Sequence, residues 1–149
     1  MTAIADNAPA RTGLDLMQAL VAGPHRGMSA LMGIDGGSAG EGWVIFLATP
    51  GPQHLNPIGT VHGGFAATLL DSCMACAVHS TLPAGVGYST IDLNISYIKA
   101  ITPTSGRVTA RGEIISRGKR VATARGTLTD SEGRLLATGT TTCLIMGAA

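Results

Sequence analysis

The feature that most constrains the fold is residues 62–80, an apolar segment too hydrophobic for a surface helix. Alanine, leucine, methionine and cysteine dominate it, and Asp71 is its one acidic residue. A helix that is apolar on nearly all sides is buried rather than lying on a surface. A single buried helix needs a sheet to cover it, so the rest of the chain has to supply that sheet.

The segments on either side of this helix supply candidate strands. Hydrophobic runs and alternating residues predict strands at about residues 28–37, 42–49, 88–98, 106–116, 120–129 and 134–146, and a short amphipathic helix at 14–22. The glycine-rich stretch GGSAGEG is the expected turn between the first two strands. Alternation in 88–98 places Thr90 with Asp92 on a polar face, opposite Leu93. Very short turns predict an antiparallel meander for the last strands. The fold class is therefore α+β, a curved antiparallel sheet wrapped around a long central helix.

The chain of 149 residues suits one domain. We expect residues 1–27 to be a lead-in with a short helix and residues 28–149 to be a single domain. Hydrophobic residues make up 45% and charged residues only 13%, which favours an oligomer in which other subunits cover apolar surface.

Charge and hydropathy also exclude some partners. The net charge is +1 and no long Lys/Arg run occurs, so nucleic acid is not an expected partner. No apolar stretch is long and unbroken enough for a membrane span, and the N-terminus lacks the pattern of a signal peptide. We therefore expect no membrane partner and a cytoplasmic location.

The remaining candidate motifs argue against several chemistries. Cys73 and Cys76 form a CxxC inside the apolar helix, where free cysteine is a common core residue. No HxxxH pair occurs and the acids are scattered, so we expect no metal site. No GxSxG elbow occurs, which argues against a serine hydrolase.

The strings NPIGTVHGGFAATLLDS and STIDLNISYIKA, with the order of elements above, resemble the hot-dog-fold acyl-CoA thioesterases. The closest likeness is to the phenylacetic-acid-degradation subgroup, over roughly residues 28–146. The resemblance implies hydrolysis of an acyl- or aryl-CoA thioester to a free acid and CoA. It implies no cofactor, since CoA is part of the substrate. It also implies chains paired edge to edge, often as a dimer of dimers (a homotetramer), with active sites between chains.

The spacing within the opening motif bears on how such a site is built. His62 and Asp71 are nine residues apart, which on one helix is about 13 Å and half a turn away from each other. They therefore cannot share one site within a single chain. The resemblance implies that the HGG end comes from one subunit and the aspartate from its neighbour.

Gly63 and Gly64 stand at the predicted start of the helix, where backbone N–H groups have no intrahelical acceptors. Glycine lets a ligand approach them closely, and the helix dipole favours negative charge there. That suits a thioester carbonyl developing into an oxyanion, and the resemblance points to the Gly63 N–H as the polarising donor, with Gly64 beside the substrate. The alternative is that both glycines only permit a tight turn.

Asp71 lies among apolar residues, and a buried carboxylate needs a hydrogen-bond partner or a cavity. Our hypothesis is that it activates water or attacks the thioester directly. The alternative is a structural acid that caps a loop or pairs with an arginine. Four other polar residues are site candidates: His62, Asn56, Ser72 and Ser89. His62 would orient a loop carbonyl or, alternatively, transfer a proton. The resemblance makes Asn56 a contact near the thioester or the attacking water, and the alternative is an ordinary turn residue.

One basic cluster, RGKR, occupies the turn between two predicted strands. It consists of Arg117, Gly118, Lys119 and Arg120. A basic turn with a glycine can hold phosphate through charge and backbone N–H groups. The resemblance assigns this region to the nucleotide end of CoA, and the alternative is a solvated hairpin tip.

Two other functions stay open at this point. One is a hot-dog hydratase or dehydratase acting on acyl thioesters, and the other is an acyl-CoA-binding module without catalysis. The HGG string followed by Asp71 favours hydrolysis. The sequence does not indicate which acyl group is used.

Overall fold

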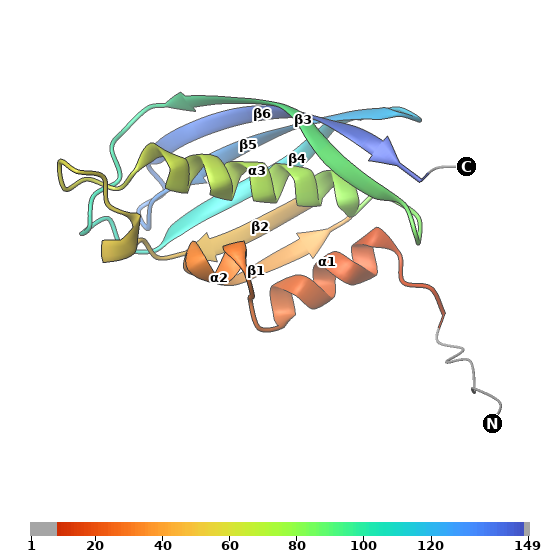
Figure 1. Ribbon diagram of the computed structural model, residues 1–149, viewed down its shortest axis with the longest axis horizontal. Coiled ribbons are helices and arrows are strands. Elements are labelled where there is room, and N and C mark those ends of the chain that lie inside the picture. The colour runs from red at the N-terminus through yellow and green to blue at the C-terminus, as the bar shows by residue number, and fades with distance from the viewer. Residues whose placement is uncertain (1–8, 148–149) are drawn as a thin grey trace.

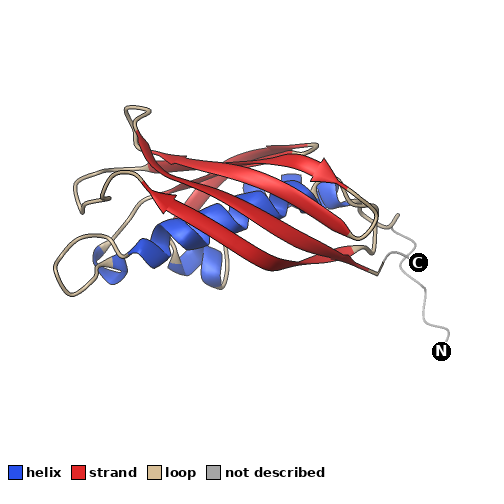
Figure 2. Cartoon of the chain, turned by 90° about the horizontal axis from the view of Figure 1, so that it is seen from above, coloured by secondary structure: helices blue, strands red, loops and turns tan. Residues whose placement is uncertain are grey.

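The apolar segment forms one helix, α3, from Gly63 to His79, as the sequence predicts. In the computed structural model, which describes residues 9–147, α3 lies along one face of a curved antiparallel sheet (Figure 1). Figure 2 shows the strands crossing that helix obliquely from above. The predicted arrangement of a sheet wrapped around a central helix is therefore confirmed.

The sheet has six strands in the order β1-β2-β4-β5-β6-β3. Their bounds are Ile34–Gly40 for β1, Trp43–Ala48 for β2, Gly87–Tyr97 for β3, Val108–Arg117 for β4, Val121–Thr129 for β5 and Leu135–Met146 for β6. Strands β4, β5 and β6 form the predicted meander. Strand β3 pairs only with β6, so β1 and β3 are the two edges of the sheet.

A row of glycines fixes how closely α3 approaches the sheet. Gly112, Gly126 and Gly139 are direct partners on β4, β5 and β6. A Cβ atom on Gly112 would lie 2.3 Å from the carbonyl of Cys73, and one on Gly126 would lie 2.9 Å from Met74 Cγ. Only glycine fits beneath α3 at these positions. The row therefore sets the depth at which α3 sits, and with it the positions of Gly63 and Asp71.

The cysteines of the CxxC are part of the core. Cys73 and Cys76 are both buried and free. Burial raises the pKa of the Cys76 thiol to about 11, and it raises the pKa of the Cys73 thiol further. A thiol held protonated is a poor nucleophile and a poor metal ligand. This agrees with the core role predicted from the sequence.

Two predictions near the N-terminus are wrong. Residues 28–31 form a short helix, α2 (Met28–Leu31), rather than the start of a strand. Gly27 and Gly33 on either side of it have φ of 58° and 69°, which reverse the chain direction around it. Strand β1 then runs through most of the glycine-rich stretch, and the turn into β2 is at Glu41 and Gly42.

The short N-terminal helix α1 spans Gly13–Ala22 and packs against β1. Its Met17 side chain is buried in the same core as α3. Thr12 caps it by accepting the Asp15 N–H. Within the described residues, α1 is thus packed onto the domain expected to begin at residue 28. Residues 1–8 of the predicted lead-in lie outside the described part of the chain.

Strand β3 contains an irregularity that the alternation did not predict. Its pairing with β6 shifts register between Thr90 and Asp92, which leaves Ile91 as an extra residue. Thr90 therefore faces α3, together with Leu93 and Ile95, while Asp92 faces outward. The prediction that Thr90 and Asp92 share the polar face is wrong for this reason.

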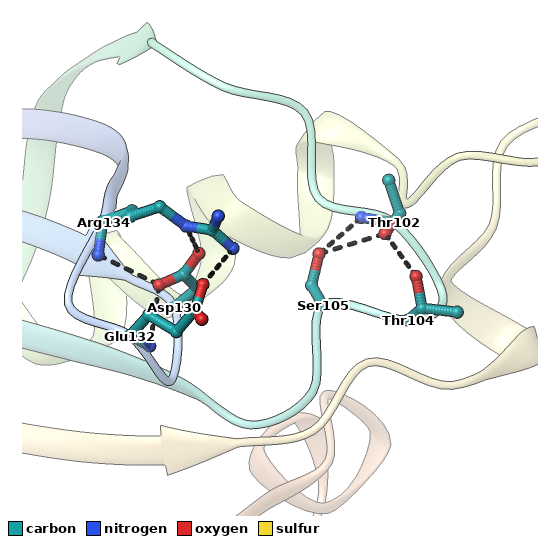
Figure 3. Close-up of polar contacts among 6 residues, drawn as sticks. All are labelled: Thr102, Thr104, Ser105, Asp130, Glu132 and Arg134. Atoms are coloured by element: carbon teal, nitrogen blue, oxygen red, sulfur yellow. Dashed lines mark hydrogen bonds and ion pairs between the residues drawn. The ribbon is translucent and has the colours of Figure 1, made fainter.

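Polar side chains hold two turns at one end of the sheet (Figure 3). Ile101 and Leu136, which flank these turns, line a hollow together with Gly63. The turn between β5 and β6 is closed by Asp130, which accepts hydrogen bonds from the Arg134 side chain and from backbone N–H groups. These bonds, above all that from Arg134, hold the pKa of Asp130 below its usual value. After β3, the Thr102 N–H donates to Ser105 Oγ at 2.9 Å.

Candidate active site

The loop that leads into α3 is shaped by Asn56. Its Oδ1 accepts the N–H groups of Ile58 and Thr60, each at 3.1 Å, and its Nδ2 donates to Thr60 Oγ1 at 2.7 Å. These bonds close a tight turn around Gly59, which has φ of 84°. Within the described chain Asn56 therefore bonds inside its own loop, and its predicted role as a contact near the thioester stays a prediction.

The start of α3 is capped by His62. The His62 Nδ1 accepts the Gly64 N–H at 2.8 Å, and the His62 carbonyl accepts the Phe65 N–H at 2.9 Å. The imidazole thus caps the helix through Nδ1, and the predicted role of His62 in orienting a loop carbonyl stays a prediction. It also occupies the Gly64 N–H, so that group is not a free donor for a substrate.

Gly63 retains an unused donor. Across residues 9–147 its N–H has no hydrogen-bond acceptor, while its carbonyl accepts the Tyr97 hydroxyl at 2.8 Å. An unpaired N–H in the first turn of a 17-residue helix also benefits from the helix dipole. The group therefore has the properties of an oxyanion donor.

Two hollows flank the start of α3. The first, called here the β3 hollow, has a volume of about 250 Å³ and lies beside Gly63, Tyr97, Ile98 and Lys99. The second, called here the α2 hollow, has a volume of about 370 Å³ and is lined by Met28, Met32, Leu55, Phe65 and Thr68, among others. His62 lines both hollows.

Asp71 is partly buried on α3, where Thr90 contacts it. The Thr90 hydroxyl donates to Asp71 Oδ1 at 2.9 Å. No Lys or Arg of residues 9–147 lies within ion-pair distance of Asp71, so the arginine-pairing alternative finds no support within one chain. The second oxygen, Oδ2, accepts no hydrogen bond from the described residues and remains available.

Gly63 and Asp71 do not meet within the chain. Eight residues separate them, which is about 12 Å along the helix axis. Both are nevertheless contacted by the same strand, because Tyr97 at one end of β3 reaches Gly63 and Thr90 near the other end reaches Asp71. Strand β3 therefore links the two groups structurally while keeping them apart.

Thr90 is the polar contact that the sequence analysis missed. Ser89 was the predicted residue on this strand, yet its side chain is exposed and forms no hydrogen bond with the described part of the chain. Ser72, next to Asp71, is partly buried and likewise forms none through its side chain there. The signal for Thr90 is the bulge in β3, which alternation alone does not reveal.

The basic turn lies at the opposite end of the molecule from Gly63. Arg117 ends β4, beside Ser80 and Thr81 at the C-terminal end of α3. The 17 residues of α3 put about 25 Å between its two ends. Arg117, Lys119 and Arg120 have exposed side chains, and the Gly118 N–H is already bonded to the Val121 carbonyl at 2.8 Å. Within one chain, the cluster and Gly63 cannot contact the same end of a ligand.

Two further findings concern residues 9–147 only. They contain no group of three His, Cys, Asp or Glu side chains placed to hold a metal ion. None of the helices in this part of the chain has the length and apolar character needed to cross a membrane.

Comparison with known proteins identifies the class. Residues 58–137, more than half of the chain, match the Thioesterase superfamily, and the chain belongs to that family. It is 36% identical over 88 residues to acyl-coenzyme A thioesterase 13 of Mus musculus. That alignment covers 58% of this chain and 61% of the mouse protein, which is less than two thirds of the relative's length.

Solved structures agree with this assignment. A putative thioesterase from Ralstonia eutropha, a phenylacetic acid degradation-related protein, is 30% identical with a TM-score of 0.73, over 82% of this chain and 92% of that one. A hypothetical thioesterase protein from Streptococcus pneumoniae, solved with coenzyme A, is 28% identical with a TM-score of 0.66, over 72% and 84%. The predicted family and fold are confirmed.

Proposed function

We propose that this chain hydrolyses an acyl- or aryl-CoA thioester to the free carboxylic acid and CoA. The observation that carries the proposal is the unpaired Gly63 N–H at the start of α3, in a chain of the Thioesterase superfamily. The Gly63 N–H polarises the thioester carbonyl and stabilises the oxyanion. The similarity to an acyl-coenzyme A thioesterase, and to a thioesterase solved with coenzyme A, supports CoA as the thiol of the substrate.

Asp71 of a partner chain is the proposed base or nucleophile. In the base route, its carboxylate takes a proton from water as the water oxygen bonds to the carbonyl carbon. The tetrahedral intermediate then collapses, the C–S bond breaks, and the proton passes to the CoA thiolate. In the nucleophile route, a carboxylate oxygen bonds to that carbon, the C–S bond breaks, and water cleaves the anhydride. Both routes release CoA and the acid. The free Asp71 Oδ2 and the hydrogen bond from Thr90 to Oδ1 are compatible with either route.

Self-association through the free edge of β3 would bring these groups together. Tyr97 and Thr90 mark the Gly63 and Asp71 positions along this strand. Two β3 strands paired antiparallel about their midpoint, near Leu93 and Asn94, would set the Tyr97 end of one chain beside the Thr90 end of its partner. The exposed Ile91, 59% accessible, supports an edge that another chain covers. A dimer, or a dimer of dimers, is therefore part of the proposal.

The basic turn of Arg117, Gly118, Lys119 and Arg120 is proposed to bind the phosphates of CoA held at a partner's Gly63. Its cationic side chains are exposed and form no ion pair within residues 9–147, which supports this role. Its distance from Gly63 in the same chain again requires a second subunit. The predicted cytoplasmic location stays a prediction, as do the roles of Ser72, Gly64 and Ser89 in the assembled site.

Turnover of the Asp71→Asn variant tests the proposal. Thiol release is measured over a panel of acetyl-, hexanoyl-, decanoyl- and phenylacetyl-CoA. We expect the wild-type chain to release CoA and the variant to lose about 1,000-fold or more in kcat, because it loses both base and nucleophile. The matched control is Asp35→Asn, which removes the same charge from a surface ion pair on β1.

Near-normal turnover by Asp71→Asn would exclude the assigned role of Asp71. Binding of acyl-CoA without thiol release by the wild-type chain would instead favour the non-catalytic binding module. Addition of water to an enoyl-CoA would favour the hydratase. A 3-hydroxyacyl- and an enoyl-CoA in the panel make that distinction.

A further inference from the structure

The two hollows beside α3 differ in one charged residue. The α2 hollow has apolar walls from Met28, Met32, Leu55 and Phe65 beside polar but uncharged ones, and no Asp, Glu, Lys or Arg lines it; the polar residues are Gln53, His54, His62 and Thr68. The β3 hollow is lined mainly by aliphatic residues and also by Lys99, whose side chain is exposed. A thioester has one apolar arm and one arm that ends in phosphates. The wall chemistry therefore matches the acyl arm to the α2 hollow and the CoA arm to the β3 hollow.

The position of the Gly63 N–H agrees with this assignment of the acyl arm and the CoA arm. Gly63 lines the β3 hollow, Gly64 lines the α2 hollow, and His62 is common to both. A carbonyl bound at the Gly63 N–H thus stands between the two spaces. At about 370 Å³ the α2 hollow falls in the size range of ligand pockets, roughly 300–1,000 Å³. It has room for an aryl or medium-chain acyl group.

The outer wall of the α2 hollow is a short and separate element. Helix α2 has four residues between Gly27 and Gly33, and Met28 is 58% exposed. Methionine side chains are flexible and fill irregular spaces. The outer wall of the hollow therefore depends on α2, while Phe65 of the buried core forms part of its inner wall.

His54 connects this wall to the donor. Its ring Nε2 lies 2.6 Å from the carbonyl of Leu31 in α2, and its ring packs 4.7 Å from that of Phe65. Its own carbonyl accepts the His62 N–H at 2.7 Å, directly before Gly63. An acyl group in contact with α2 thus contacts a wall that His54 connects by hydrogen bonds to the residue before Gly63.

We propose that the α2 hollow binds the acyl group, that this group is apolar and uncharged, and that Met28 on α2 sets its maximum length. The proposal rests on the proposed hydrolysis of CoA thioesters. It concerns the acyl arm alone and assigns Met28 a role in specificity and none in the chemical step.

The test is Met28→Trp, which narrows the hollow from its exposed wall. We expect kcat/KM for decanoyl-CoA to fall about tenfold or more relative to acetyl-CoA, because pocket contacts of a few methylenes discriminate at that level. Leu31→Trp is the matched control, since Leu31 lies on the same helix, is 64% exposed and does not line the hollow. Its ratio of decanoyl- to acetyl-CoA should stay within about twofold of the wild type.

Ile98→Trp in the β3 hollow separates the two arms. It should lower kcat/KM for all acyl lengths by the same factor, because every substrate carries the same CoA arm. A length-dependent loss in Ile98→Trp, or an equal loss across lengths in Met28→Trp, would overturn the assignment.

Calorimetric affinities for the same acyl-CoA series keep this test independent of hydrolysis. Absence of thiol release in the wild-type chain would refute the proposed function. Loss of the preference for decanoyl-CoA in the affinities of Met28→Trp would still support the acyl pocket, and an unchanged preference would refute it.

Discussion

The two edges of the sheet differ in what covers them. Strand β1 has seven residues, three of which are glycines, and α1 of the same chain packs against it (Figure 1). Strand β3 has eleven residues, carries exposed apolar side chains and contacts both Gly63 and Asp71. An edge with unpaired backbone groups and apolar side chains is a template for another strand. The β1 edge is thus covered by α1 of the same chain, whereas the β3 edge, which contacts the candidate site, is not paired with another strand of the chain.

Among changes that compare the two edges, the largest expected effect comes from placing a charge on the open edge. Ile91→Lys on β3 should split the assembly into monomers and lower thiol release by at least about 100-fold, because burying an unpaired charge at an interface costs several kcal/mol. The same change on β1, Ser38→Lys, should leave mass and activity unchanged. Light scattering coupled to size exclusion gives the mass. A dimeric, active Ile91→Lys protein would show that β3 is not the interface.

The next effect concerns the donor beside β3. Gly63→Pro removes the N–H at the first helical position, where proline is tolerated, and should lower kcat by about 100-fold. Gly63→Ala is the control, because its Cβ makes the same close contact with the Tyr97 ring, 3.1 Å, but the donor remains. A proline variant as active as the alanine variant would exclude the Gly63 N–H as oxyanion donor.

Mixing two inactive variants asks whether the site spans two chains. When Gly63→Pro and Asp71→Asn chains exchange subunits at random, half of the resulting dimers are heterodimers. One of the two sites in each heterodimer is intact. About a quarter of the wild-type activity should therefore return after subunit exchange. A site contained within one chain would give no recovery.

The sequence was sufficient for the parts of the fold that depend on hydrophobic periodicity. The bounds of α3 and of β3 to β6 differ from the predicted ones by a residue or two, because each is a long apolar or alternating run that ends at turn residues. Helix α2 could not be predicted in this way. It depends on the positive φ of Gly27 and Gly33, and the sequence does not reveal which of its many glycines adopt that conformation.

The candidate site was predicted in part. The free Gly63 N–H follows from its place at a helix start, and the structure has it unpaired among residues 9–147. Two physical reasons limit the rest. First, the hydrogen bond from the Gly64 N–H to His62 and the bonds of Asn56 within its turn are local choices that residue type leaves open. Second, contacts between chains do not appear in the periodicity of one chain.

The smallest expected effects concern the two edge strands, each of which has a β-bulge near its first residue. The bulge in β1 is at Asp35, which pairs on the surface with Arg107 at 2.7 Å, and the bulge in β3 turns Thr90 towards Asp71. Thr90→Val removes one hydrogen bond to a carboxylate and should lower kcat about tenfold with KM unchanged. Asp35→Asn should cost at most about 1 kcal/mol of stability and leave kcat as it is. Ser89→Ala is measured alongside. A larger loss in kcat for Ser89→Ala than for Thr90→Val would show that a hydroxyl from the neighbouring chain, and not Thr90 at the bulge, contacts Asp71.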